Sequence, residues 1–371
     1  MDRPLAEGLF TDHHCHGVMA HDLSRTEFEG LASESSAPPP EGATAFDSQL
    51  GFLIRSRCAP VLGLEPHASP EAYLERRRAL GADEVNRRLL GGAGIGAFVV
   101  ETGYRGGAIT DPEQTAAFAG GRAAEVVRLE RIAEEVFEFT RADDDFCAAF
   151  RLALEERQRE AVGFKSIAAY RCGLEIAPEA PAEEDVRREV RAWRESGSGR
   201  LESETVIRFL LQEAVRFRKP IQFHVGYGDD DVDLHRCSPL LMTAWLRTLR
   251  GAGVDVTLLH CYPFHREAGF LAHVFPHVYA DVGLAVNYTG ARSGAVVEEF
   301  LELIPFHKAL FSSDAFGLAE LYWLGAHLFR RGYESAARRW TEGGDWSPED
   351  ARRVFRMIAS ENAARVYRLG G

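Results

Sequence analysis

Residues 9–17 read LFTDHHCHG, a short apolar start followed by an aspartate and three histidines. Side chains alternate between the two faces of a β-strand, so a strand here places His14 and His16 on one side and Cys15 on the other. Asp12 shares the parity of the two histidines. Imidazole and carboxylate groups are ligands of zinc and related divalent ions. The stretch therefore predicts a strand that ends in metal ligands, although a single H-x-H match is too common to carry that hypothesis alone.

Short β-rich segments recur along the chain, separated by longer segments with apolar residues at three- and four-residue spacing. The predicted strands are 9–14, 96–101, 126–131, 163–168, 220–225, 255–260, 278–283 and 309–314. The predicted helices include 70–90, 132–160, 202–218 and 236–250, and helix starts are expected at Ser69-Pro70 and Ser347-Pro348. Alternating strands and helices in eight units predict an α/β fold, a (β/α)8 TIM barrel. A doubly wound open sheet is the alternative, but no G-x-G-x-x-G turn follows the first strand.

Two segments interrupt this alternation. Residues 17–60, which include SESSAPPPEGAT, form an insertion after the first strand whose Ser, Pro and Gly content suits a loop or a small subdomain. At a barrel mouth such an insertion is either a lid or surface decoration. Residues 172–201 are rich in charge and predict surface decoration. We expect one barrel domain over residues 1–371, with 17–60 as an insertion or lid within it.

The composition favours a small-molecule partner. A net charge of −13 argues against a nucleic-acid binder, because phosphate contacts require a basic face. The opening MDRPLAEGLF lacks the pattern of a signal peptide, and the longest apolar run, GIGAFVV, is too short to span a bilayer. Six cysteines without a C-x-x-C pair indicate buried, reduced thiols. We expect a cytoplasmic homo-oligomer with no membrane partner.

Polar residues stand at the carboxyl ends of five predicted strands, where active sites of such barrels collect. These residues are His14, His16, Lys165, His224, His260 and Asp314. A single histidine is most often structural, but this ordered set predicts a metal site. Lys165 either forms an ion pair or contacts a substrate carboxylate, or its buried neutral amine reacts with CO2 to give a carbamate that bridges two metals. We favour the carbamate.

The motifs DHHCH, FKSIAAYR, FHVG, LLHCYPFHREAG and FSSDA together resemble the amidohydrolase superfamily. More narrowly, the chain resembles the branch that contains γ-glutamyl amide hydrolases and amidohydrolase domains fused to glutamine-synthetase-like modules. The resemblance extends to FEGLASES and to GADEVNRRLLGGAGIGAFVVETGY. It covers nearly the whole chain.

The resemblance implies a metal hydrolase with His14 and His16 on one ion and His224 and His260 on a second. A carboxylated Lys165 would bridge the two ions, and Asp314 would contact the first ion and the nucleophilic water. We expect two Zn2+, with Mn2+ or Fe2+ as alternatives. Some members of the wider branch hold a single metal, and some of those are decarboxylases.

The chemistry expected of this site is hydrolysis of a C–N amide bond, such as that of a γ-glutamyl or other acyl amide, by metal-activated hydroxide, with Asp314 as the proton shuttle. A mononuclear decarboxylase of an unsaturated or aromatic acid is the alternative, and a non-catalytic binding module is a third hypothesis. The candidate substrate-binding residues are Tyr104, Arg105, Tyr170, Arg171, Tyr227, Asp229, Tyr262, His265, Arg266 and Asn287. Arg171 and Arg266 either grip a substrate carboxylate or form structural salt bridges. The acidic run 229–233 predicts a solvated loop, with amine binding as the alternative.

Overall fold

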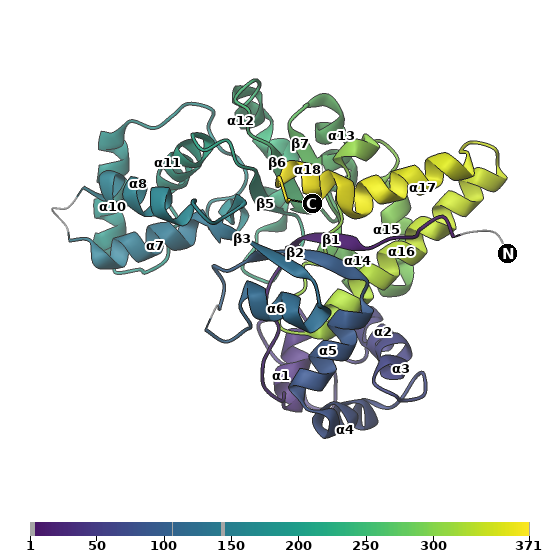
Figure 1. The fold of residues 1–371 in the computed structure, drawn as a ribbon. Coiled ribbons are helices and arrows are strands. Elements are labelled where there is room, and N and C mark those ends of the chain that lie inside the picture. Colours follow the sequence, from purple (N-terminus) through teal and green to yellow (C-terminus); the bar gives the residue numbers. More distant parts are fainter. Residues whose placement is uncertain (1–3, 106, 142–144, 371) are drawn as a thin grey trace.

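The parallel sheet is curled and follows the order of the sequence (Figure 1). A computed structural model describes residues 4–105, 107–141 and 145–370. The strands are β1 (Phe10–Cys15), β2 (Ile95–Glu101), β3 (Arg122–Arg128), β4 (Gly163–Ser166), β5 (Ile221–Val225), β6 (Val256–His260) and β7 (Val278–Ala280). Each strand pairs in parallel with the next. The predicted α/β barrel class is confirmed.

We expected an eighth strand at 309–314, but this segment, which closes the barrel, lacks regular strand geometry. The segment still bonds to both edges of the sheet. The Leu310 N–H donates to the Ala280 carbonyl at 2.9 Å, and the His13 N–H donates to the Phe311 carbonyl at 3.1 Å. Residues 309–315 therefore lie between β7 and β1, although their hydrogen bonds are too few for a ladder.

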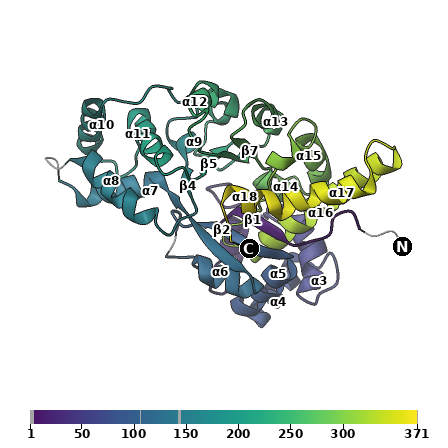
Figure 2. The ribbon, with the colours of Figure 1, turned by 45° about the horizontal axis from the view of Figure 1, so that its top comes forward.

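Helices surround the sheet and alternate with its strands (Figures 1 and 2). The first nine are α1 (Arg25–Leu31), α2 (Gln49–Leu53), α3 (Ala59–Val61), α4 (Pro70–Leu80), α5 (Ala82–Gly92), α6 (Pro112–Ala119), α7 (Leu129–Phe139), α8 (Phe146–Arg157) and α9 (Ala168–Arg171). The others are α10 (Glu183–Ser196), α11 (Glu204–Val215), α12 (Thr243–Thr248), α13 (His265–Val274), α14 (Gly283–Tyr288), α15 (Ser293–Phe300), α16 (Ala319–Glu342), α17 (Pro348–Arg356) and α18 (Asn362–Val366). Within the described ranges, no helix combines the length and the apolar character needed to cross a bilayer.

Local sequence signals set several helix boundaries. Ser69 and Ser347 accept hydrogen bonds from backbone N–H groups in the first turns of α4 and α17, as their Ser-Pro motifs predict. Two predicted helices are each divided in two. The segment 70–90 breaks at Gly81, whose φ of 79° suits glycine and separates α4 from α5. The segment 132–160 divides into α7 and α8.

The first insertion forms a small helical layer rather than a loop alone. A capping box between Ser24 and Glu27 starts α1. The Phe28 ring stacks on Phe46 at 5.4 Å between centroids and packs near Tyr73 of α4. Helices α1 to α4 lie together in the lower part of Figure 1. This packing holds the end of α1 beside the barrel mouth.

A buried ion pair joins this layer to the barrel. The Arg77 guanidinium of α4 donates to both carboxylate oxygens of Glu320 in α16, at 2.7 and 3.3 Å, and the Tyr73 hydroxyl donates to the same carboxylate at 2.8 Å. Arg77 and Glu320 are both buried. Removing one partner would leave a charge without compensation in a medium that solvates it poorly.

We expect Glu320→Gln to lower the free energy of unfolding by about 3 kcal/mol, because Arg77 stays charged and buried. The midpoint of urea unfolding measures this change. Arg188→Ala, which removes an exposed pair with Asp185, is the matched control and should cost less than about 1 kcal/mol. Equal losses of unfolding free energy in the two variants would contradict a larger contribution from the buried pair.

Candidate metal centre

The six predicted strand-end residues line one cavity at the carboxyl ends of the strands. Its volume is about 450 Å3. The residues come from β1 and the turn that follows it, from β4, β5 and β6, and from the segment between β7 and α16; they are His14, His16, Lys165, His224, His260 and Asp314. Their convergence agrees with the sequence analysis, and their role as metal ligands stays a prediction.

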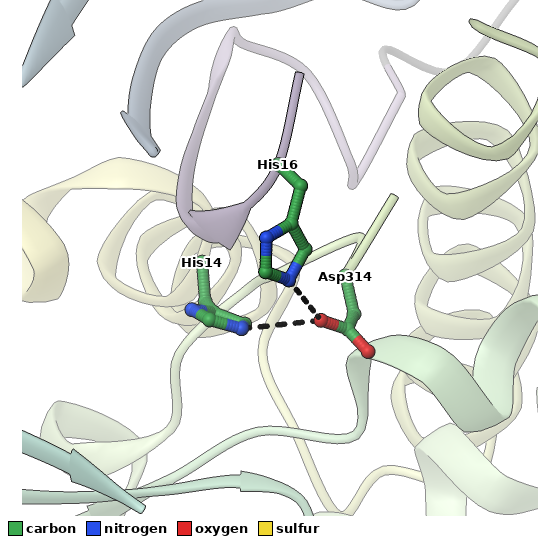
Figure 3. A group of neighbouring side chains, drawn as sticks. All are labelled: His14, His16 and Asp314. Atoms are coloured by element: carbon green, nitrogen blue, oxygen red, sulfur yellow. Dashed lines mark ion pairs between the residues drawn. The ribbon is translucent and has the colours of Figure 1, made fainter. Parts of the chain in front are cut away.

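Three of these side chains form a tight group (Figure 3). The Nε2 atoms of His14 and His16 lie 3.1 and 3.7 Å from the same carboxylate oxygen, Oδ1 of Asp314. One donor atom from each residue lies within 4.8 Å of the others. Two imidazoles and one carboxylate are a donor set typical of catalytic zinc, which leaves a further position open.

His224 and His260 extend the group toward β5 and β6. His260 Nδ1 lies 3.4 Å from Asp314 Oδ2, and the ring centroids of His224 and His260 are 4.8 Å apart. Among the residues that the structure describes, neither His224 Nε2 nor His260 Nδ1 has a hydrogen-bond partner, and both atoms are buried. Because buried polar atoms are nearly always bonded, these two nitrogens fit a bound metal.

Burial sets the charge state of these groups. It lowers the pKa of His14, His224 and His260 well below the usual histidine value, and that of His16 to about 4. Neutral imidazole is the form that binds a metal. Burial also raises the pKa of the Asp314 carboxyl, an effect that the Lys165 ammonium opposes.

Lys165 is buried beside the histidines. Its Nζ atom lies 3.4 Å from His14 Nε2. Burial lowers the pKa of its amine to about 8, although Asp314 and Glu101 favour the charged form. Burial therefore makes the neutral form of this amine more accessible than that of an exposed lysine.

A second layer of polar residues orients the two β1 ligands. Gln222 Oε1 accepts a 2.8 Å hydrogen bond from His14 Nδ1, and this bond directs the lone pair of His14 Nε2 toward the centre. His16 Nδ1 lies 3.4 Å from Glu101 Oε2. Arg128 donates to both oxygens of the Glu101 carboxylate, at 2.5 and 3.1 Å. Each ligand is thus fixed from behind by a carbonyl or carboxylate oxygen.

Tyr367, at the end of α18, belongs to the same polar network. The Tyr367 hydroxyl accepts from Gln222 Nε2 at 2.9 Å and lies 3.0 Å from His13 Nδ1. His13 Nε2 in turn contacts Asp281 Oδ2 at 2.8 Å, and Asp281 Oδ1 accepts from the backbone N–H of His260 at 2.9 Å. The network connects strands at opposite sides of the barrel and positions His260.

Asp12 does not join the centre, although it shares the parity of His14 and His16. Its carboxylate accepts hydrogen bonds from the backbone N–H of Ser313, at 3.0 Å, and from the Ser313 hydroxyl, at 2.5 Å. The register of β1 against β2 shifts between Asp12 and Cys15, which changes the simple alternation. Asp12 therefore fixes the segment that presents Asp314.

We expect Gln222→Leu to weaken metal binding by about 10- to 100-fold, because the variant removes the acceptor that orients His14. Titration of the metal-free protein with Zn2+ against a competing chelator measures this affinity. Gln158→Leu, at the end of α8, is the control. An unchanged zinc affinity in Gln222→Leu would show that Gln222 does not set the orientation of His14.

Comparison with known proteins now places the chain. The sequence model of the family described as Amidohydrolase matches residues 102–369. This protein belongs to the amidohydrolase family. It is therefore an enzyme, and the superfamily resemblance seen in the sequence is confirmed.

The matches between this amidohydrolase and individual relatives differ in the share of each chain that they cover. A crystal structure from Lactobacillus casei, provisionally assigned as a metal-dependent hydrolase, has a TM-score of 0.85 and 29% identity over 98% of this chain and 96% of that chain. Protein fluG of Emericella nidulans is 30% identical over 225 residues, which are 56% of this chain and 26% of fluG. This chain thus matches about a quarter of fluG. Uronate isomerase from Thermotoga maritima shares the fold, with a TM-score of 0.64 and 12% identity over 97% and 94% of the two chains.

The predicted substrate residues of the amidohydrolase separate into two groups. Five of them line the cavity: Tyr104, Arg105, Tyr170, Arg171 and Asp229. Tyr104 lies beside His16, with ring centroids 6.5 Å apart. Arg171 pairs with Glu134 at 3.0 Å, which is the structural alternative weighed for it.

The structure does not place the other five predicted substrate residues along the cavity; they are Tyr227, Tyr262, His265, Arg266 and Asn287. Arg266 is exposed and pairs with Glu302 at 2.9 Å on the surface. The Tyr227 ring packs on Tyr288, and Tyr262 stacks on His265. Asn287 is buried and donates to the Ser313 carbonyl at 3.2 Å, so it supports the Asp314 segment.

Other cavity residues escaped prediction. Glu34 comes from the first insertion, Tyr288 ends α14, and Arg200 lies at the end of the segment 172–201. Arg200 donates to the Tyr170 carbonyl at 2.5 Å, so the second insertion is more than surface decoration. Asp229 and Asp231 also line the cavity, which corrects the expectation of a purely solvated loop. Glu101 and Arg128 stand at strand ends, a signal that was present in the sequence.

Proposed function

We propose that this enzyme is a metal-dependent amidohydrolase that cleaves a C–N amide bond of a small molecule. The convergence of His14, His16 and Asp314, with unpartnered buried nitrogens on His224 and His260, supports the proposal. A cavity of about 450 Å3 suits a small-molecule substrate. We further propose two Zn2+ ions, with His14 and His16 on one and His224 and His260 on the other.

Lys165 would connect the two halves of this centre. Its neutral amine attacks CO2, an N–C bond forms, and one proton leaves for solvent, which gives a carbamate anion in place of a cation. The low pKa of the amine and its place beside His14 favour this reaction. The anion would offset the positive charge of two ions at one buried site.

A bound divalent ion would lower the pKa of a coordinated water to about 7, so that attack on an amide carbonyl becomes feasible at neutral pH. Asp314 accepts the proton of the attacking water and returns it to the leaving nitrogen. Its carboxylate lies within 3.1–3.7 Å of His14, His16 and His260, so it is held at the centre of the site. Asp12 and Asn287 hold the backbone of Ser313, and therefore limit the motion of Asp314.

Elemental analysis together with a panel of N-acyl and γ-glutamyl amides tests the proposal. We expect about two zinc equivalents per chain and release of amine from at least one amide class. Chelation should abolish this release, and added Zn2+ should restore it. One metal equivalent together with CO2 release from an unsaturated or aromatic acid, without amide cleavage, would instead favour the decarboxylase alternative.

A further inference from the structure

Three arginines that line the cavity are already paired. Arg128 binds Glu101, Arg171 binds Glu134 at 3.0 Å, and Arg200 binds Asp231 at 2.7 Å. A fourth, Arg105, lies over the Tyr104 ring, with its Cζ atom 5.3 Å from the ring centroid. An acidic substrate group would have to displace a carboxylate to reach any of the first three. The cavity is therefore poorly suited to grip a carboxylate through these three arginines.

Two other carboxylates that line the cavity, Glu34 and Asp229, are not paired in this way with any arginine that the structure describes. Within the described part of the chain, neither Glu34 nor Asp229 has a lysine or arginine in salt-bridge contact. Glu34 interacts with the Tyr288 hydroxyl, and Asp229 accepts a 3.0 Å hydrogen bond from the Asp231 N–H. Burial raises the pKa of both carboxyls, and the charge of Asp229 raises the pKa of Glu34 further. The charge of Arg200 opposes the rise at Asp229, so Glu34 is the less compensated of the two carboxylates.

Aromatic rings lie between these carboxylates and the candidate metal centre. Tyr170 and Tyr288 line the cavity, and the Tyr170 ring is 4.5 Å from His224 between centroids. Glu34 and Asp314 both line the cavity, so the two carboxylates border the same space. Electron-rich ring faces attract ammonium groups, particularly when water is partly excluded.

The candidate metal centre adjoins this space. His224 Nε2 is buried and lacks a hydrogen-bond partner among the described residues, and it lies on the side of the cavity shared with Tyr170. This nitrogen fits the second proposed ion, so a substrate held at the metal centre would extend beside Tyr170. The carboxylates thus adjoin the place where the proposed substrate binds.

We propose that Glu34, assisted by Asp229, determines specificity by binding a protonated amino group of the substrate. The inference rests on the proposed amide hydrolysis and narrows it to amides that carry a second, positively charged amine. Glu34 comes from the insertion after β1, so that insertion supplies the specificity of the site. The scissile carbonyl would lie at the Asp314 end of the cavity and the ammonium at the Glu34 end.

Matched substrates test this assignment. N-acetyl-1,4-diaminobutane and N-acetylbutylamine share one amide but differ in terminal charge, and 4-aminobutanamide and butanamide place the charge on the acyl side. We expect kcat/KM to favour the charged member of at least one pair by tenfold or more. Glu34→Gln should remove that preference mainly through KM, while Glu41→Gln, an exposed position of the same insertion, should keep it. Equal cleavage of charged and neutral amides by the wild type would overturn the inference and leave amide hydrolysis standing.

A binding measurement tests the ammonium site separately from the proposed amide hydrolysis when no amide is cleaved. Calorimetric titration of the zinc-loaded enzyme with 1,4-diaminobutane should show an affinity at least tenfold higher in the wild type than in Glu34→Gln, with 1,4-butanediol as the neutral control. That result without amide turnover would support the ammonium site and contradict the proposed reaction. Equal affinity in both proteins would show that any bound amine is held elsewhere, and would overturn the role of Glu34.

Discussion

The Asp314→Asn variant is expected to lose at least about 1,000-fold in kcat on any amide that the wild type cleaves. Asparagine keeps the shape of the side chain and one oxygen toward His14 and His16. It cannot accept the proton of the attacking water or return it to the leaving nitrogen. The loss should therefore appear in kcat with little change in KM, measured by steady-state kinetics.

Asp255→Asn provides the control for this prediction. Asp255 is also a partly buried aspartate with a raised pKa, but it precedes β6 and lies at the opposite end of the barrel from the centre. That variant should keep kcat within about threefold of the wild type. A kcat for Asp314→Asn within tenfold of the wild type, in a protein that still holds its zinc, would exclude Asp314 as the proton shuttle.

Lys165→Met is expected to reduce zinc from about two equivalents to one and to lower kcat/KM by at least about 100-fold. Methionine preserves much of the volume but cannot form a carbamate. Without that anion, two ions at one buried site would repel each other. Metal analysis after dialysis, together with kinetics, measures both effects.

Lys308→Met controls for the loss of a buried lysine. Lys308 is buried like Lys165, but its amine donates to the Ala272 and Phe275 carbonyls at 2.6 and 2.5 Å, at the end of α13. Its replacement should lower stability and leave zinc content unchanged. Full zinc content and full activity in Lys165→Met would refute the bridging role.

The sequence was sufficient to place the strand-end side chains. Parallel strands deliver their carboxyl ends to one face of the barrel, so His224 after PIQF and His260 after VTLL could be assigned to that face without coordinates. The same rule placed Asp314, although its segment lacks regular strand geometry. The position of a strand end depends on the local sequence pattern, which a single sequence is enough to show.

Contacts between distant segments were not predictable in the same way. Arg266 pairs with Glu302, 36 residues later, and no local pattern distinguishes that pair from a substrate contact. Gln222 lies inside β5 and shares the parity of His224, but no local pattern pairs it with His14, 208 residues earlier. Glu34 follows a helix of an insertion whose path over the barrel depends on the packing of Phe28 and Phe46. These positions depend on tertiary packing.

The position of Tyr367 has a consequence for how the enzyme matures. His13 and Tyr367 are in contact across 354 residues, and Asp12 contacts Ser313 across 301. The histidines of β1 are synthesised before Ser313 and Tyr367, the groups that fix their surroundings. Contacts of such sequence separation form late in folding. The finished ion-binding geometry therefore cannot arise until the chain has been synthesised through Tyr367.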